Sequence, residues 1–355
     1  MANSLNKVTT KSILDATVAT ADIAADAITG AKIADDAINS EHYTDGSIDT
    51  AHIADAQITP AKIASGSKLV TTDGQNNTVV GTNAGDSFDG TNATDNTLIG
   101  KDAGTAITTG DDNTAIGSAS LAANTTGGYN TVLGSNALDS NTTGSFNTAV
   151  GQSALAGNTT ASYNTAIGRE ALLANTTASY NTAVGKGALT ANTTGERNTS
   201  VGFNSLEANT TGAYNTAVGS GSLNDNTTGA GNVAVGYSAL PVNTTAANNT
   251  AIGRVCLEVN TTGANNTAVG SNALVSNTTG GNLTAIGKNA LDANTTADNN
   301  TAVGYSALGA NTTGIQHTAV GYGALETVTT ANNNTALGFK ALQVNTQASN
   351  TAVGT

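Results

Sequence analysis

One pentapeptide, Asn-Thr-Ala-Val/Ile-Gly or a near variant, recurs every 17 residues through most of this chain. Shifting the segment 181–197 by 17 residues in either direction returns almost the same sequence. A fixed period over most of a chain indicates an array of one structural unit, which constrains the fold more than any other feature. In fourteen consecutive copies the pentapeptide ends on a glycine: Gly117, Gly134, Gly151, Gly168, Gly185, Gly202, Gly219, Gly236, Gly253, Gly270, Gly287, Gly304, Gly321 and Gly338.

Each unit divides into a strand, a turn and a loop. Thr182-Ala-Val184 alternates polar and apolar residues and contains a β-branched side chain, which predicts a short β-strand. Gly185 ends the strand, and its presence in every copy indicates a positive φ or a close backbone approach. The loop is Asn192-Thr-Thr-Gly195; its glycine is replaced by alanine in other copies, so no left-handed conformation is required there.

A single unit offers too little apolar surface to fold alone. Val184 and Leu189 are its two large apolar side chains, and burying both contributes about 4 kcal/mol. Ordering 17 residues costs roughly 1.5 kcal/mol for each residue. Stability must therefore come from stacking, and we expect three chains packed together to share the valine and leucine faces.

Residues 1–66 carry a different period, with an isoleucine or a similar residue at every fifth position. This spacing forms no stripe on an α-helix and alternates between the faces of a straight strand. Two structures satisfy it: a single-chain pentapeptide-repeat β-helix, or an intertwined homotrimeric shaft. The carboxylates of Asp26, Asp36 and Glu41 would be buried in the single-chain helix, which costs several kcal/mol, so we favour the trimeric shaft.

The change of period predicts three regions. Residues 1–66 form an N-terminal shaft or attachment region. Residues 67–117 form a junction with atypical capping repeats, since Ala84-Gly85 and Ala103-Gly104 replace the Ala-Leu pair of later units. Residues 118–355 form the array of 17-residue β-roll units.

Composition excludes several classes of function. The net charge is −13 and no cluster of Lys and Arg is present, so we expect no nucleic-acid binding. No segment approaches 18 consecutive apolar residues, and the first thirty residues contain no apolar run of signal-peptide length, so we expect no membrane insertion and no recognisable export signal. Cys256 is the single cysteine, which excludes an intrachain disulfide, and we expect a small buried residue rather than a reactive thiol.

No catalytic, cofactor or metal site is predicted, and the chain is not expected to be an enzyme. The three histidines, His42, His52 and His317, lie in two different regions. His317 takes the asparagine position of its repeat, so we interpret it as a substitution in a ladder rather than as a ligand. The glycines form no phosphate-binding loop.

The Asn-Thr-Thr loops are the best candidate for a functional surface. We predict a polar ladder along the array in which asparagine side chains hydrogen-bond from unit to unit. Repeated weak contact with a sugar and ice binding are the alternatives. The ladder residues are Asn124, Asn141, Asn158, Asn175, Asn192, Asn209, Asn226, Asn243, Asn260, Asn277, Asn294 and Asn311.

An aromatic row accompanies the strands in the first half of the array. Its members share one repeat position, and we expect them to pack between units, with stacking on sugars as the alternative. The row consists of Tyr129, Phe146, Tyr163, Tyr180 and Tyr214.

The repeats resemble the heads of trimeric autotransporter adhesins. Asn-Thr-Ala-Val-Gly-x-x-Ala-Leu, as at 266–274 and 300–308, is similar to the Ser-x-Ala-Ile-Gly-x-x-Ala repeat of that family. The resemblance implies a trimeric left-handed β-roll with Val269 and Val303 facing its interior and Gly270 and Gly304 at tight turns. The adhesin unit is shorter and lacks the Asn-Thr-Thr-Gly loop.

The decads at the N-terminus, as at 25–34, are similar to segments of tailed-bacteriophage fibre proteins, in which such shafts precede adhesin-like arrays. Together the two resemblances imply an all-β fibrous homotrimer that serves as a phage tail fibre, located in the virion and used for host attachment. Its partners would be other copies of itself, a tail or capsid protein bound through residues 1–66, and a glycan or protein on the host surface. A bacterial trimeric adhesin at the cell surface and an ice-binding solenoid remain the alternatives.

Overall fold

The computed structural model describes residues 71–72, 74–88 and 92–355, which belong to the compact unit Ala64–Thr355. The predicted shaft at 1–66, with its partner contacts, His42 and His52, lies outside the described residues. The regular secondary structure of the described residues is entirely β-strand.

Eighteen short strands follow one another along the described chain. Their bounds are β1 Thr71–Thr72, β2 Thr78–Val80, β3 Thr97–Ile99, β4 Thr114–Ile116, β5 Thr131–Leu133, β6 Thr148–Val150, β7 Thr165–Ile167, β8 Thr182–Val184, β9 Thr199–Val201, β10 Thr216–Val218, β11 Val233–Val235, β12 Thr250–Ile252, β13 Thr267–Val269, β14 Thr284–Ile286, β15 Thr301–Val303, β16 Thr318–Val320, β17 Thr335–Leu337 and β18 Thr351–Val353. The strand predicted at 182–184 is β8.

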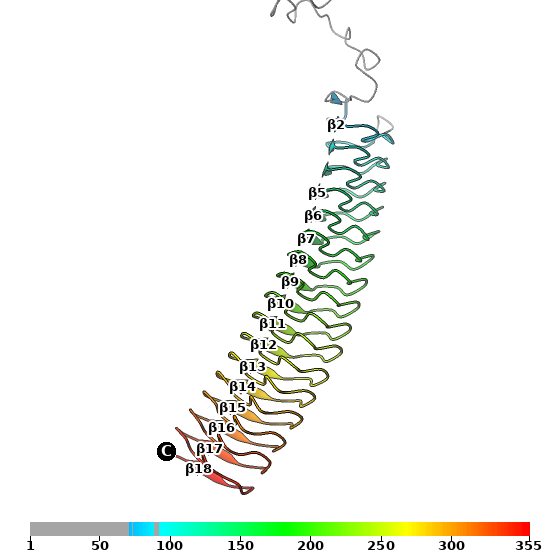
Figure 1. The fold of residues 1–355 in the computed structure, drawn as a ribbon. Helices are drawn as coiled ribbons and strands as arrows, with labels where there is room; N and C mark the ends of the chain where they lie inside the picture. Colours follow the sequence, from blue (N-terminus) through cyan, green and yellow to red (C-terminus); the bar gives the residue numbers. More distant parts are fainter. Residues whose placement is uncertain (1–70, 73, 89–91) are drawn as a thin grey trace, which may run out of the picture. The chain divides into compact units, whose positions relative to one another are not determined.

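The strands from β2 to β18 form one parallel sheet in which each strand pairs with the next strand along the chain (Figure 1). In the pairing of β8 with β9, Thr182 is opposite Thr199 and Val184 is opposite Val201. Strand β1 pairs antiparallel with β2. Each repeat is therefore one coil of a β-solenoid, and we number the positions of a coil from 1 at the asparagine before the strand, so that coil 181–197 runs from position 1 to position 17.

The glycine at position 5 allows successive coils to stack closely. Gly185 has a φ of +134°, a backbone conformation that residues with a side chain rarely adopt. A Cβ there would lie 2.7 Å from the carbonyl carbon of Gly202. All fourteen predicted turn glycines have φ values of this kind. Position 5 therefore requires glycine both for its positive φ and for the close approach of the next coil.

The core consists of small and large side chains in alternation along each coil. The alanines at positions 3 and 8 and the leucine at position 9 are buried, as Ala183, Ala188 and Leu189 show. The predicted interior position of Val269 and Val303 is wrong, because both are partly exposed while Ala268 and Ala302 face inward. In most coils leucine and two asparagines fill the rest of the interior, and the inward position of the strand holds alanine; Val132 and Ser200 are exceptions among the later coils.

The first coils fill the same interior with different residues. In coil 96–112, Gly104 stands at the leucine position, while Leu98 and Ile107 are buried at positions 3 and 12. A Cβ at Gly104 would lie 2.8 Å from side-chain carbons of both Leu98 and Ile107. These two side chains therefore replace the volume of the missing leucine, and β2 to β4, within the predicted junction at 67–117, continue the same sheet as the later coils.

Candidate functional site

The predicted ladder of position-12 asparagines lies inside the solenoid. All twelve side chains from Asn124 to Asn311 are fully buried, so they do not form the surface that the sequence suggested. The amide of Asn141 donates to Asn124 Oδ1 at 2.7 Å and to the Gly144 carbonyl at 2.9 Å. The prediction that these side chains hydrogen-bond from coil to coil is confirmed, and no contact with an external sugar follows from them.

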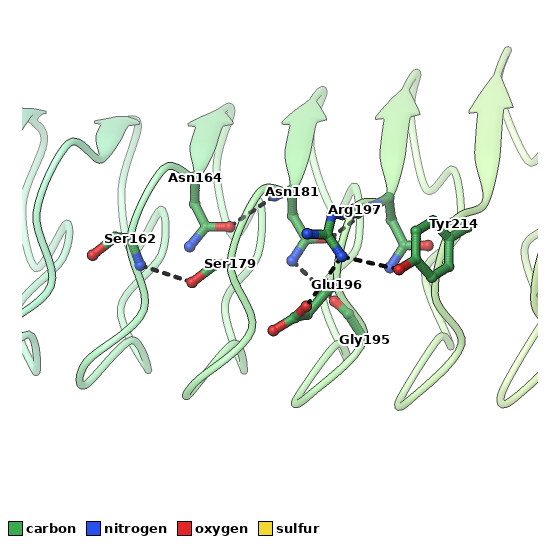
Figure 2. Close-up of polar contacts among 9 residues, drawn as sticks. Ser162, Asn164, Ser179, Asn181, Gly195, Glu196, Arg197 and Tyr214 are labelled. Atoms are coloured by element: carbon green, nitrogen blue, oxygen red, sulfur yellow. Dashed lines mark hydrogen bonds and ion pairs between the residues drawn. The ribbon is translucent and has the colours of Figure 1, made fainter.

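A second buried ladder runs through the asparagines at position 1. The backbone N–H of Asn181 donates to Asn164 Oδ1 at 2.9 Å, and the Asn181 amide donates to the Gly195 carbonyl at 2.9 Å (Figure 2). The same carbonyl accepts a bond from Asn192. The two ladders together attach each loop to its own strand and to the neighbouring coil, which satisfies buried polar groups that would otherwise destabilise the fold.

Apolar residues terminate the position-12 ladder at both ends. Ile107 occupies the position before Asn124, and Val328 occupies the position after Asn311; both are buried. Since valine cannot donate, Asn311 Oδ1 is left without a hydrogen-bond partner. The position-12 ladder therefore ends at an apolar side chain on both sides, while the position-1 ladder continues through Asn113 and His317.

His317 takes its place in the position-1 ladder, as predicted. Its backbone N–H donates to Asn300 Oδ1, Nε2 lies 2.6 Å from the Ala331 carbonyl, and Nδ1 accepts the N–H of Asn334 at 3.2 Å. These contacts require a neutral ring with its proton on Nε2. Burial lowers the pKa of His317, and the two hydrogen bonds oppose this effect.

Cys256 is a buried core residue at the alanine position. Its Sγ lies 3.3 Å from the Ala268 carbonyl, and burial raises the pKa of the thiol to about 12. The prediction of a small buried residue is confirmed. In coil 198–214, serines replace both core alanines, and the hydroxyls of Ser200 and Ser205 contact each other.

The outward face of the sheet carries a continuous row of exposed or partly exposed apolar side chains. The side chains at positions 2 and 4 of each coil, the first and last residues of the strand, point outward. In β2–β18, position 2 is threonine except in β11, and position 4 is valine, isoleucine or leucine. Ile167 is 40% exposed and Leu133 is 48% exposed. We call this surface the strand face.

The predicted aromatic row at position 17 lies at the N-terminal end of the strands. Tyr129, Phe146, Tyr163 and Tyr180 stack in sequence, with ring centroids 4.9–5.2 Å apart and planes within 3° of parallel. Arg197 continues the row between the rings of Tyr180 and Tyr214, and its Nη1 lies 2.9 Å from the Tyr214 hydroxyl (Figure 2). Packing between coils is confirmed, and because neighbouring residues cover the ring faces inside the row, those faces are closed to a sugar.

A second aromatic row at position 6, beyond the C-terminal end of the strands, was missed by the sequence reasoning. Tyr305, Tyr322 and Phe339 stack with centroids 5.1 and 5.3 Å apart, and Phe203 and Tyr237 share their position. The signal was available, since these residues follow the repeat glycines at the same 17-residue spacing. Most basic residues of the described chain also occupy position 6.

Two acidic residues border a shallow recess near the end of the array. Asp292 and Glu326 occupy position 10 of coils that flank Gly309, whose missing side chain leaves the space open. Burial raises the pKa of the Asp292 carboxyl. Among residues 74–88 and 92–355, no three His, Cys, Asp or Glu side chains are placed to hold a metal ion.

A search for helices long and apolar enough to cross a bilayer found none in the described part of the chain. No protein-family description and no curated protein sequence matches this chain.

Proposed function

We propose that this protein is a structural fibre of a virus particle, a tail fibre that projects from the virion, contributes to host attachment and catalyses no reaction. The observation that carries the proposal is the unbroken parallel pairing from β2 to β18, which makes a continuous stack of coils. Each coil is joined to the next by backbone pairing and by asparagine ladders. Such a stack transmits force along its axis through many parallel hydrogen bonds.

The strand face supports assembly from three copies. From β3 to β18 its position-4 side chains are all valine, isoleucine or leucine, and each is exposed or partly exposed. A contiguous exposed apolar surface is typical of a site of protein interaction. The valines that the resemblance placed inside one roll would then be buried between rolls.

The viral context is supported by the resemblance of the N-terminal decads to phage fibre segments, and residues 1–66 would bind the tail or capsid. The attachment role follows from the same resemblance. The receptor would be a glycan or protein on the host surface, contacted by parts of the fibre other than the buried asparagines.

Ice binding is the second candidate, and one observation favours it. On most strands a threonine and a valine or isoleucine lie side by side on the outward face, and this pair repeats from strand to strand at a coil spacing of about 4.8 Å. A regular array of hydroxyl and methyl groups can order water. In that case the strand face would remain open to solvent, and the protein would show thermal hysteresis.

The mass of the native particle tests the proposal. We expect light scattering to give about three times 34.8 kDa, together with a trimer band on an unheated denaturing gel. A folded particle of 34.8 kDa would contradict the fibre and leave the strand face exposed, as ice binding requires.

A further inference from the structure

From β3 to β17, the side chains at the two ends of each strand form no ring contact, hydrogen bond or ion pair with each other within the chain. Position 17 precedes the strand and position 6 follows it, so the intervening strand separates them. The ring contacts instead run along each row, from Tyr129 to Phe146 and from Tyr305 to Tyr322. Tyr129 and Tyr237 are 57% and 60% exposed, so both rows keep a free outer edge.

The residues at the two ends of each strand are complementary in size. Among β2 to β17, no strand has an aromatic residue at both ends, although ten of these strands have one at a single end. At the other end stands a smaller or polar residue. The position-17 and position-6 pairs are Tyr129 and Ser135, Phe146 and Gln152, Tyr163 and Arg169, Tyr180 and Lys186, Arg197 and Phe203, Tyr214 and Ser220, Gly231 and Tyr237, Asn299 and Tyr305, Gln316 and Tyr322, and Asn333 and Phe339.

Charge is complementary at one strand. Asp95 and Lys101 occupy the two ends of β3, the only described strand with a charged residue at both ends. Arg169 and Lys186 lie at strands whose other end carries a tyrosine. The contact of Arg197 with a tyrosine hydroxyl at 2.9 Å within one row shows how such a pair can bond.

Three-fold symmetry would bring the two rows together. In a cyclic trimer whose axis runs along the fibre, equivalent coils lie at equal height, and each interface joins one edge of a subunit to the other edge of its neighbour. Position 17 of one copy would then meet position 6 of the same strand in the next copy. This arrangement requires the residues at the two ends of one strand to be complementary in size. Within a single chain those residues do not contact each other, so their complementarity has no structural role there.

We propose that the rows at positions 17 and 6 form the interface of the homotrimer, an inference that rests on the proposed function. The strand faces turn toward the common axis, and each residue at position 17 packs against the position-6 residue of the same strand in the adjacent copy. The partner is therefore a second copy of this chain in parallel orientation and exact register. The level-by-level pairs, and not the uniform valine strip alone, specify that register.

Cysteine cross-linking tests the register. In a Cys256→Ala background, Asn265→Cys and Ser271→Cys place thiols at the two ends of β13. We expect oxidation to convert this variant to covalent dimers and trimers on a non-reducing gel. The matched control combines Asn299→Cys with Ser271→Cys, which are two coils apart, a shift of about 10 Å that exceeds the reach of a disulfide.

The outcomes separate this interface from the fibre itself. A trimer by light scattering in which the matched pair cross-links no more than the shifted pair would overturn the interface and leave the fibre standing. Cross-linking by either single-cysteine variant would also overturn it, because that requires like edges to meet. A monomer by light scattering would overturn both proposals.

Discussion

Coils 130–180 and coils 300–339 share one interior and differ on the surface. Both bury alanine at position 8 and leucine at position 9, and both bury alanine at position 3 except at Val132. In the first region the aromatic rings stack before the strands, at Phe146 and Tyr163, and in the second they stack after the strands, at Tyr305 and Tyr322. The coil geometry therefore dictates the interior, while the surface rows follow a requirement that changes along the array, which we assign to contact between copies.

The largest expected effect tests the shared interior. Gly168→Ala and Gly321→Ala each place a Cβ 2.6 Å from the carbonyl carbon of the next repeat glycine, at φ values of +134° and +133°. We expect each substitution to destabilise the protein by about 3 kcal/mol or more. Chemical denaturation followed by circular dichroism measures the change.

A glycine from another position of the coil is the control for these substitutions. Gly195→Ala lies at position 15, where other coils carry alanine and φ is not positive. Its Cβ would come close to the Gly212 carbonyl and Asn192 Oδ1, so the loop must shift, but without backbone strain the substitution should cost less. A large difference between Gly168→Ala and Gly321→Ala would show that the two regions do not share one interior.

An intermediate effect tests the surface difference. Ser135→Tyr adds a ring at the strand that already carries Tyr129, whereas Ser271→Tyr adds one at a strand whose other end is Asn265. We expect the first change to weaken the trimer by about 1–3 kcal/mol through overpacking and the second to be tolerated. Subunit dissociation on dilution, followed by light scattering, measures both.

Equal effects of the two tyrosines would remove the argument from complementary ends. Neither residue contributes to the core, since both lie at partly exposed or exposed surface positions. Circular dichroism of the two variants should therefore match that of the parent protein.

The smallest expected effect is a pH dependence confined to the second region. Folding lowers the pKa of His317 from its value of about 6.5 in the unfolded chain. The contribution of His317 to stability is therefore complete above pH 6.5 and declines as the pH falls below it. The hydrogen-exchange protection factors of amides in β15 to β17 should therefore fall more on acidification than those in β5 to β8. His317→Asn restores the repeat residue and should abolish the difference; persistence of the difference in that variant would exclude His317 as its cause.

The period predicted the array, the strands and the turn glycines because each depends on local backbone requirements that recur in every copy. Gly185 is an example, since both its φ and its contact with Gly202 follow from the tight stacking of coils. The loop glycine was also predicted correctly: Gly195 does not have a positive φ, which agrees with the alanines found at that position.

The sequence could not decide which side of each strand faces inward. In Thr182-Ala-Val184 either the alanine or its two neighbours can face the core. The resemblance to adhesin heads placed the valine of this position inside, and that choice was wrong. The asparagine ladder was placed on the surface for a similar reason: a polar side chain indicates exposure unless its hydrogen bonds are known. Once Asn141 bonds to Asn124 and Gly144, burial becomes favourable.

A reconstruction by electron cryomicroscopy would show directly how the copies are arranged. We expect three parallel solenoids with their strand faces toward one axis, equal coils at equal height and the residues of positions 17 and 6 in contact between neighbours. A single solenoid with a solvent-exposed strand face, or three solenoids whose strand faces point outward, would contradict it.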